Sequence, residues 1–200
     1  IVLDVKCGSG AFMKDYESAK KLAEKMVALG HLAGRKVVAV ISSMNQPLGN
    51  YIGNSLEVIE AMEVLKGNVF GDLGEVAVTL GGHMLVLAKR VENVEEGKAL
   101  LLENIKNGKG IEKFRQMVAN QGGNPEVTKN YDLLPKASVI KEFKAEKDGY
   151  IFSMHADTVG KASQETGAGR AKKEDEIDYG AGIIINARLG DFVKCGDVLA

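Results

Sequence analysis

The fold is decided by the segment IVLDVKCGSG at residues 1–10, together with the helix and strand patterns that follow it. Residues 1–5 are mostly apolar and β-branched, and they predict a buried strand that ends before a Gly-Ser-Gly loop. From residue 16 to residue 33, apolar side chains recur at steps of three and four, which predicts an amphipathic helix closed by Gly34. Residues 36–43 contain a second buried strand pattern. This order predicts a βαβ unit, whose two strands run parallel and are covered by helices.

The rest of the chain divides into a helical part and a part with short strands. Helical patterns occupy residues 54–65, 73–90, 94–107 and 110–120. Gly, Asn and Pro then interrupt the pattern over 121–135, and short strands are predicted at 137–143, 149–154 and 181–187. The predicted fold class is therefore α/β. A parallel-sheet lobe with flanking helices is expected over residues 1–136, followed by a smaller α+β, β-rich domain over residues 137–200.

Composition limits the classes of partner. The chain has 200 residues with 26 basic and 27 acidic side chains, so its formal net charge is −1. This balance argues against a nucleic acid or an anionic membrane surface held by bulk electrostatics. No apolar run approaches the roughly 20 residues needed to span a bilayer. The two cysteines, Cys7 and Cys195, are far apart in sequence, which favours free thiols in a reducing cytoplasm.

The glycine loop after the first strand has part of a dinucleotide-binding fingerprint. Met13 stands where the third glycine is required, and the next strand ends in Ser42 and Ser43 rather than in an acidic residue. The loop therefore indicates a sharp turn at the carboxyl end of a strand, the edge at which open α/β sheets bind ligands. The histidines are scattered, and no catalytic or metal-binding set is predicted around them.

A candidate cation site precedes the second predicted helix. The segment Gln46–Tyr51 contains Pro47 and Gly49, and the helix that follows carries glutamates at positions 57, 60 and 63. A solvated acidic face is the ordinary explanation for such glutamates. However, a loop whose glycine lets carbonyl groups point inward, together with one carboxylate, suits a hard cation and in particular a monovalent one. Spacing alone does not decide between the two explanations.

The end of the chain indicates architecture rather than chemistry. Residues 190–199, GDFVKCGDVL, have the spacing of the strand–turn–strand corner in biotinyl- and lipoyl-like folds. The triplet at residues 60–62 resembles a biotin-attachment signature, but Glu63 stands where the modified lysine is required. We therefore expect a small β-rich sandwich and not a carrier module.

Three longer motifs point to a family. Residues 4–13 (DVKCGSGAFM), 44–50 (MNQPLGN) and 53–58 (GNSLEV) closely resemble the pyrimidine-nucleoside phosphorylase family, of which thymidine phosphorylase is a near relative. The resemblance continues through residues 177–179 and 187–191. It implies a cytoplasmic homodimer that cleaves uridine, thymidine or deoxyuridine with phosphate, giving the base and a pentose 1-phosphate. Such enzymes have a small helical domain and a large α/β domain, with the active site between them.

The resemblance also implies roles for individual residues. Phe12 matches an aromatic residue that lines the pyrimidine pocket. Leu48, Tyr51 and Glu60 match a potassium site, in which the first two act through their backbone carbonyls; Tyr51 stands where alanine is usual. The phosphate loop and the arginine, serine and lysine that hold the base are expected upstream of Ile1. Because the chain starts and stops within strand patterns, we expect a fragment that contains no catalytic residue and is inactive by itself.

Two other functions are carried as alternatives. A phosphoribosyltransferase of the same fold needs a paired acidic magnesium motif in the lobe at residues 1–136, whereas the acidic run at residues 174–176 lies in the second predicted domain. A carrier or interaction module built on the C-terminal domain would need the modifiable lysine that is missing here. The sequence does not identify the preferred nucleoside or the dimer contacts.

Overall fold

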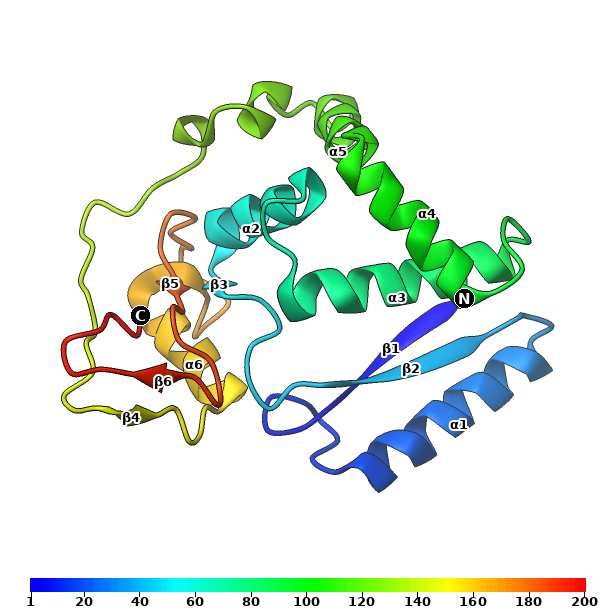
Figure 1. Cartoon of the computed structure of the whole chain (residues 1–200), viewed down its shortest axis with the longest axis horizontal. Helices are drawn as coiled ribbons and strands as arrows, with labels where there is room; N and C mark the ends of the chain where they lie inside the picture. Colours follow the sequence, from blue (N-terminus) through cyan, green and yellow to red (C-terminus); the bar gives the residue numbers. More distant parts are fainter. The chain divides into compact units, whose positions relative to one another are not determined.

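The parallel strand pair predicted at the start of the chain is present in the computed structural model, which describes residues 1–200. β1 (Val2–Cys7) and β2 (Val38–Ser43) pair in parallel along their whole length, and α1 (Tyr16–Leu32) connects them (Figure 1). The prediction of a βαβ unit is confirmed.

Two features make α1 form where it does. It starts after Asp15, whose carboxylate accepts a hydrogen bond of 2.8 Å from the backbone N–H of Ser18, so one of the unpaired donors at the helix start is satisfied. Its small residues Ala19 and Ala23 are buried against Val5 of β1. The helix is therefore held by a cap at one end and by close packing on the strand pair.

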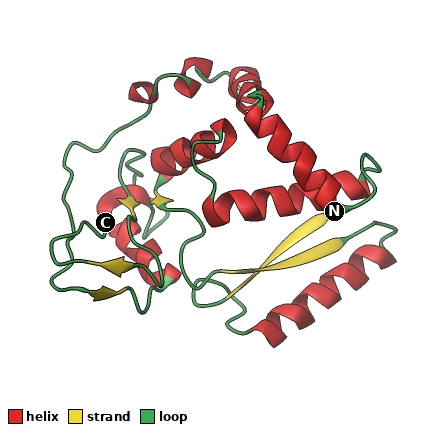
Figure 2. Ribbon diagram, viewed as in Figure 1, coloured by secondary structure: helices red, strands yellow, loops and turns green.

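The chain forms two compact units. The first contains residues 1–44 and 63–114, and the second contains residues 45–62 and 115–200. Figure 2 shows that the first is mainly helical apart from its strand pair, whereas the second has short strands joined by long loops. The domain boundary predicted at residue 136 stays a prediction.

In the first unit, α3 (Gly71–Leu87) packs on the β1–β2 pair, and α4 (Val94–Lys106) packs on α3. The two helices approach closely because glycines face each other at their contact. A Cβ atom on Gly97 would lie 2.8 Å from the Cα atom of Gly82. The strand pair is thus flanked by helices, as the predicted fold class requires.

Two further helices run from one unit into the other. These are α2 (Asn54–Lys66) and α5 (Lys109–Asn120). All four helices predicted between residues 54 and 120 are confirmed, with ends that differ by up to three residues. No single helix is both long and apolar enough to cross a membrane, and only α2 and α3 would meet that test if they were taken together.

The second unit contains two short antiparallel strand pairs. β3 (Tyr51–Ile52) pairs with β5 (Ile183–Ile184), and β4 (Gly149–Tyr150) pairs with β6 (Phe192–Val193). The rings of Tyr150 and Phe192 meet edge to face with centroids 5.1 Å apart. The smaller, β-containing C-terminal region that was predicted is therefore present.

Helical turns fill much of the rest of the second unit. They are η1 (Pro125–Thr128), η2 (Tyr131–Leu133), α6 (Ala156–Ser163) and the π-helical turn η3 (Gln164–Ala168).

The structure corrects the sequence analysis in this region. No strand forms at residues 137–143, where Val139 and Ile140 are 69% and 87% exposed. Only Phe143 pairs with the chain end, through hydrogen bonds with Leu199 and Ala200. An apolar run forms a strand only where a partner satisfies its backbone groups, and residues 137–142 have no partner strand. The other two predicted strands are present but shorter, and α6 was not predicted.

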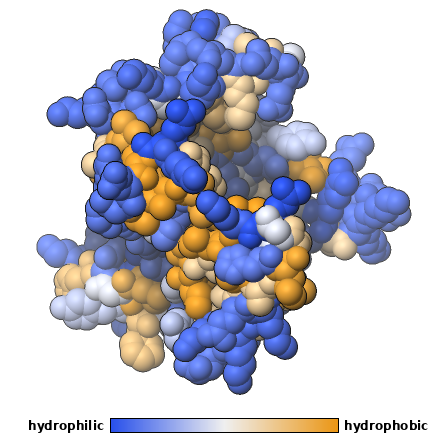
Figure 3. All heavy atoms as spheres, turned by 90° about the vertical axis from the view of Figure 1, so that its right-hand side faces the viewer, coloured by the Kyte–Doolittle hydropathy of each residue, from blue (hydrophilic) through white to orange (hydrophobic).

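Apolar side chains remain on the surface, as the space-filling view shows (Figure 3). On α1, Leu29 and Leu32 are 66% and 86% exposed. In the loop after β1, Phe12 is 98% exposed.

Candidate functional site

The carboxylate of Glu60 is the centre of the candidate site. Glu60 lies in α2 and is only 5% exposed. One of its oxygens accepts a hydrogen bond of 2.6 Å from the backbone N–H of Asn50, and the other accepts one of 3.2 Å from the N–H of Tyr51. Hydrogen bonds between a carboxylate and backbone N–H groups are charge-assisted and strong. The predicted loop and the predicted glutamate therefore meet, and the explanation of Glu60 as part of a solvated acidic face is wrong.

Gly49 allows the loop to come this close to Glu60. A Cβ atom at this position would lie 2.1 Å from Oε2 and 2.8 Å from Cδ of Glu60. The requirement for glycine here is therefore one of space, since any side chain would occupy the position of the carboxylate.

A second segment of the chain, residues 185–189, holds the same loop. The guanidinium of Arg188 donates hydrogen bonds of 2.7 Å to the carbonyl oxygen of Pro47 and of 3.1 Å to that of Gly49. It also donates one of 2.6 Å to the side-chain oxygen of Asn50. The backbone N–H of Ile185 donates to the carbonyl oxygen of Asn50 at 2.7 Å. The carbonyl groups of Pro47, Gly49 and Asn50 are thus all taken by protein donors.

The N–H of Leu189 adds one more contact to the loop, a hydrogen bond of 3.1 Å to the side-chain oxygen of Gln46.

The carbonyl groups of Leu48 and Tyr51, the two predicted ligands from the loop, lie at other positions. In the β3–β5 pair, the hydrogen bond from Ile185 to Asn50 makes Tyr51 and Ile184 a non-hydrogen-bonded pair. The N–H of Tyr51 points away from β5 to Glu60, and in a strand the C=O of the same residue lies on the same edge. The carbonyl of Leu48 lies between the two that Arg188 holds.

The oxygen atoms at this site determine which kind of metal ion it could bind. No group of three or more His, Cys, Asp and Glu side chains is arranged to hold a metal ion anywhere in residues 1–200. The site instead offers the carboxylate of Glu60 from α2, with lone pairs beyond the two that accept N–H groups, and two backbone carbonyls from the loop. Oxygen donors of this kind, with a single negative charge, suit a hard cation of low charge.

Phe12, the other predicted site residue, lies in the first unit. Its loop turns back on the carboxyl ends of the parallel strands. The N–H of Gly8 donates to the carbonyl of Met13, and the N–H of Gly10 donates to that of Met44, both at 2.9 Å. Gly8 adopts a φ of 125°, which favours glycine. The loop is pinned at its base, and the Phe12 ring is exposed rather than packed into the core as an ordinary loop aromatic would be.

The sequence analysis missed a polar cluster on the β1–β2 pair. The ammonium of Lys6 lies 2.7 Å from the carboxylate of Asp4 and 2.9 Å from the hydroxyl of Ser42, which itself donates to Asp4. Two signals were available, because Asp4 and Lys6 are two apart in a strand and share a face, and Lys6 is opposite Ser42 in register.

Arg188 was also missed as a site residue. It appeared in the sequence only as part of the motif at residues 187–191, and its partners lie 138 to 141 residues away.

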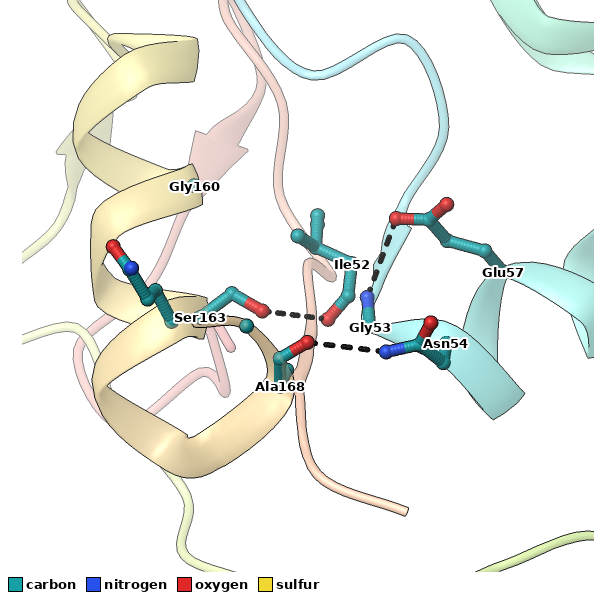
Figure 4. Close-up of a pocket in the computed structure, with 9 residues that line it drawn as sticks. Ile52, Gly53, Asn54, Glu57, Gly160, Ser163 and Ala168 are labelled. Atoms are coloured by element: carbon teal, nitrogen blue, oxygen red, sulfur yellow. Dashed lines mark hydrogen bonds between the residues drawn. The ribbon is translucent and has the colours of Figure 1, made fainter. Parts of the chain in front are cut away.

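A small cavity of about 240 Å³ lies beside the start of α2 (Figure 4). It is lined by Ile52, Gly53, Asn54, Glu57, Gly160, Ser163, Gln164, Ala168 and Gly169. The polar groups in it already bond to one another. Ser163 donates to the carbonyl of Ile52, and the N–H of Gly53 donates to Glu57. No buried side-chain nitrogen or oxygen is left without a hydrogen-bond partner here.

Comparison with known proteins finds two family models and a set of close relatives. The model described as "Glycosyl transferase family, a/b domain" matches residues 1–111, and the model described as "Pyrimidine nucleoside phosphorylase C-terminal domain" matches residues 150–200. The chain is 49% identical over 199 residues to the pyrimidine-nucleoside phosphorylase of Staphylococcus aureus strain USA300. It is 48% identical over 197 residues to that of Staphylococcus epidermidis. These alignments cover 100% and 98% of this chain but 46% of each relative, so the chain spans about half of their length.

Proposed function

We propose that this chain is part of a pyrimidine-nucleoside phosphorylase. The chain belongs to the glycosyl transferase family, because the model of that family's a/b domain matches residues 1–111. The reaction is cleavage of uridine, thymidine or deoxyuridine by phosphate, which gives the free base and ribose or deoxyribose 1-phosphate. The observation that carries the proposal is the joint match. The a/b domain match alone would not say which acceptor receives the pentose. The C-terminal family model and the relatives that align over the whole chain are both named for pyrimidine-nucleoside phosphorylase.

Phosphorolysis makes defined demands on a site. Phosphate has to be held beneath the anomeric carbon, and the leaving base needs a proton donor or a cation at its carbonyl oxygen. Much of the barrier is lowered by holding two reactants in line and stabilising an oxocarbenium-like transition state. We assign no residue of this chain to proton transfer or to phosphate binding, and propose that both functions are carried by residues upstream of Ile1.

Phe12 is proposed to form one wall of the base pocket. Its ring is 98% exposed on a loop whose base is fixed by hydrogen bonds, so it is available to pack against a flat pyrimidine. Burying this ring against a ligand would remove a large apolar surface from water. It would therefore add binding energy without any rearrangement of the loop.

The cation site is proposed to bind K⁺ through the carbonyl oxygens of Leu48 and Tyr51 and the carboxylate of Glu60. The support is the buried carboxylate of Glu60 beside this loop, whose carbonyl groups at Pro47, Gly49 and Asn50 are held by residues 185–189. The ion would supply positive charge to a buried carboxylate and so fix the loop against α2. Tyr51 is compatible with this role because only its backbone would bind.

We propose further that the enzyme works as a homodimer in the cytoplasm. Both cysteines are free, as is usual for a protein kept in a reducing compartment. The dimer is proposed from the resemblance alone, and sedimentation equilibrium of the full-length protein tests it.

The test of the function uses the full-length protein that contains these 200 residues. Incubation with uridine, thymidine or deoxyuridine and phosphate should release the base and a pentose 1-phosphate, and omission of phosphate should abolish the release. Residues 1–200 by themselves should be inactive. Absence of phosphate-dependent base release from the full-length protein would refute the proposal. Magnesium-dependent transfer from a pyrophosphorylated pentose would instead indicate a phosphoribosyltransferase.

A further inference from the structure

We infer that Arg188 is a positioning residue of the cation site, which sets the side of the loop on which the ion binds. This inference rests on the proposed cation site. Arg188 does not touch the ion itself. It acts by holding the carbonyl groups of Pro47 and Gly49, which flank the proposed ligand Leu48.

The geometry of the guanidinium carries the first step. A planar fork with several donors can bond to three acceptors at once, and here it reaches two backbone carbonyls and the side chain of Asn50. The carbonyls of Pro47 and Gly49 belong to the peptide groups on either side of the Leu48 carbonyl. Holding both of them restricts how far this part of the loop can move, and so keeps the Leu48 carbonyl within a limited region.

Charge carries the second step. The guanidinium is permanently positive, so it repels a second cation from the carbonyl oxygens of Pro47 and Gly49. The only buried carboxylate at the loop, Glu60, bonds to N–H groups of Asn50 and Tyr51. A monovalent ion is therefore repelled from the carbonyls that Arg188 occupies and attracted to those next to Glu60.

Arg188 is itself held firmly. Its neighbours Ile185 and Ala187 are 4% and 6% exposed. Its own N–H donates a hydrogen bond of 2.8 Å to the carboxylate of Asp191, across a turn in which Gly190 has a φ of 91°. The C-terminal segment thus acts as a fixed support from which the fork reaches the loop, and cation affinity depends on residues in the region matched by the C-terminal domain.

Arg188→Lys and Arg188→Met test the inference in the full-length protein. Lysine keeps the charge but presents a compact ammonium that cannot hold the same three acceptors, and methionine removes the charge. Arg35→Met is the matched control, because Arg35 is exposed in the first unit. The melting temperature of each protein is titrated with KCl and with NaCl at constant ionic strength kept by choline chloride, and phosphorolysis is titrated with KCl separately.

A positioning role changes the response to the ion and not only the stability. We expect the half-saturating K⁺ concentration to rise about tenfold or more in Arg188→Met, as for the loss of one charge-assisted hydrogen bond, and to rise less in Arg188→Lys. Preference for K⁺ over Na⁺ should fall in both variants, and Arg35→Met should match the unaltered protein. If Arg188→Met does not fold, the Arg188→Lys titration decides.

Two results would overturn the inference. A lower melting temperature with an unchanged K⁺ half-saturation would make Arg188 purely structural. If the unaltered protein shows no K⁺-specific stabilisation, the cation site itself fails. In that case the phosphate-dependent release of uracil, measured in the same preparation, shows independently whether the proposed function survives.

Discussion

Replacing Gly49 with alanine tests how closely the loop and Glu60 are fitted together. The new Cβ atom would lie 2.1 Å from one carboxylate oxygen of Glu60, so the carboxylate has to move. The carboxylate ends a flexible side chain, and the cost therefore lies in the hydrogen bonds that it gives up to Asn50 and Tyr51. Hydrogen bonds to a charged group contribute about 1.5–3 kcal/mol each, so partial loss of the pair should reduce stability by roughly 2–4 kcal/mol.

Gly160→Ala is the control for this substitution. Gly160 lies inside α6 in the same unit, and a Cβ atom there would meet nothing within 4 Å. Alanine favours a helix over glycine by about 1 kcal/mol, so this variant should be neutral or slightly stabilised.

Chemical denaturation of the full-length protein, with and without KCl, measures both effects. Gly49→Ala should lose stability and most of its stabilisation by KCl, while Gly160→Ala should keep its response to the salt. If Gly49→Ala and Gly160→Ala have the same stability and the same KCl response, the described fit between Gly49 and Glu60 is wrong.

Three further predictions concern other residues. Glu60→Gln leaves one oxygen for two N–H donors, so the half-saturating K⁺ concentration for phosphorolysis should rise about tenfold or more; an unchanged titration would count against the ion assignment. Phe12→Ala should raise KM for uridine about 5- to 100-fold, the range for loss of a base–aromatic stack, with an unchanged melting temperature because the ring is exposed; an unchanged KM would remove Phe12 from the pocket. The hydrogen bond from the N–H of Ser18 lowers the pKa of the Asp15 carboxyl below its ordinary value of 3.8. The ionised Asp15 therefore stabilises the protein fully above pH 3.8, and this stabilisation is lost as the pH falls through the lower pKa of the folded state. The melting temperature of Asp15→Ala should therefore fall below that of the unaltered protein at neutral pH, and the gap should close in acid; a constant gap would disprove the link.

The first part of the fold could be predicted because its signals are local. The βαβ unit is specified by an apolar strand, a glycine loop and a helix with three- and four-residue spacing, and all are contiguous in sequence. Helix ends were predictable to within a few residues because stops such as Gly34 are also local signals.

The C-terminal region could not be predicted equally well, since its strands depend on distant partners. β5 is two residues long and exists because Tyr51 and Ile52 pair with it. The apolar run at residues 137–143 has a similar composition but no pairing strand, and it stays irregular. Periodicity does not distinguish these cases, because the partner lies more than a hundred residues away.

The candidate site likewise contains features that the sequence indicated and features that depend on contacts between distant residues. The sequence identified Leu48, Tyr51 and Glu60 through a family resemblance, and the structure places Tyr51 in contact with Glu60. It could not identify the fork of Arg188, because nothing near residue 188 in sequence indicates which carbonyls it reaches. Nor could it show that residues 185–189 hold the carbonyl groups of Pro47, Gly49 and Asn50.

Anomalous diffraction from crystals of the full-length protein grown with Rb⁺ in place of K⁺ tests the central claim most directly. The ion scatters strongly enough to be located without reference to the protein. We predict one peak within coordination distance of the carbonyl oxygens of Leu48 and Tyr51 and of the carboxylate of Glu60. A peak at the Arg188 side of the loop, or a well-ordered loop with no peak in crystals of an enzyme that Rb⁺ activates, would contradict the account.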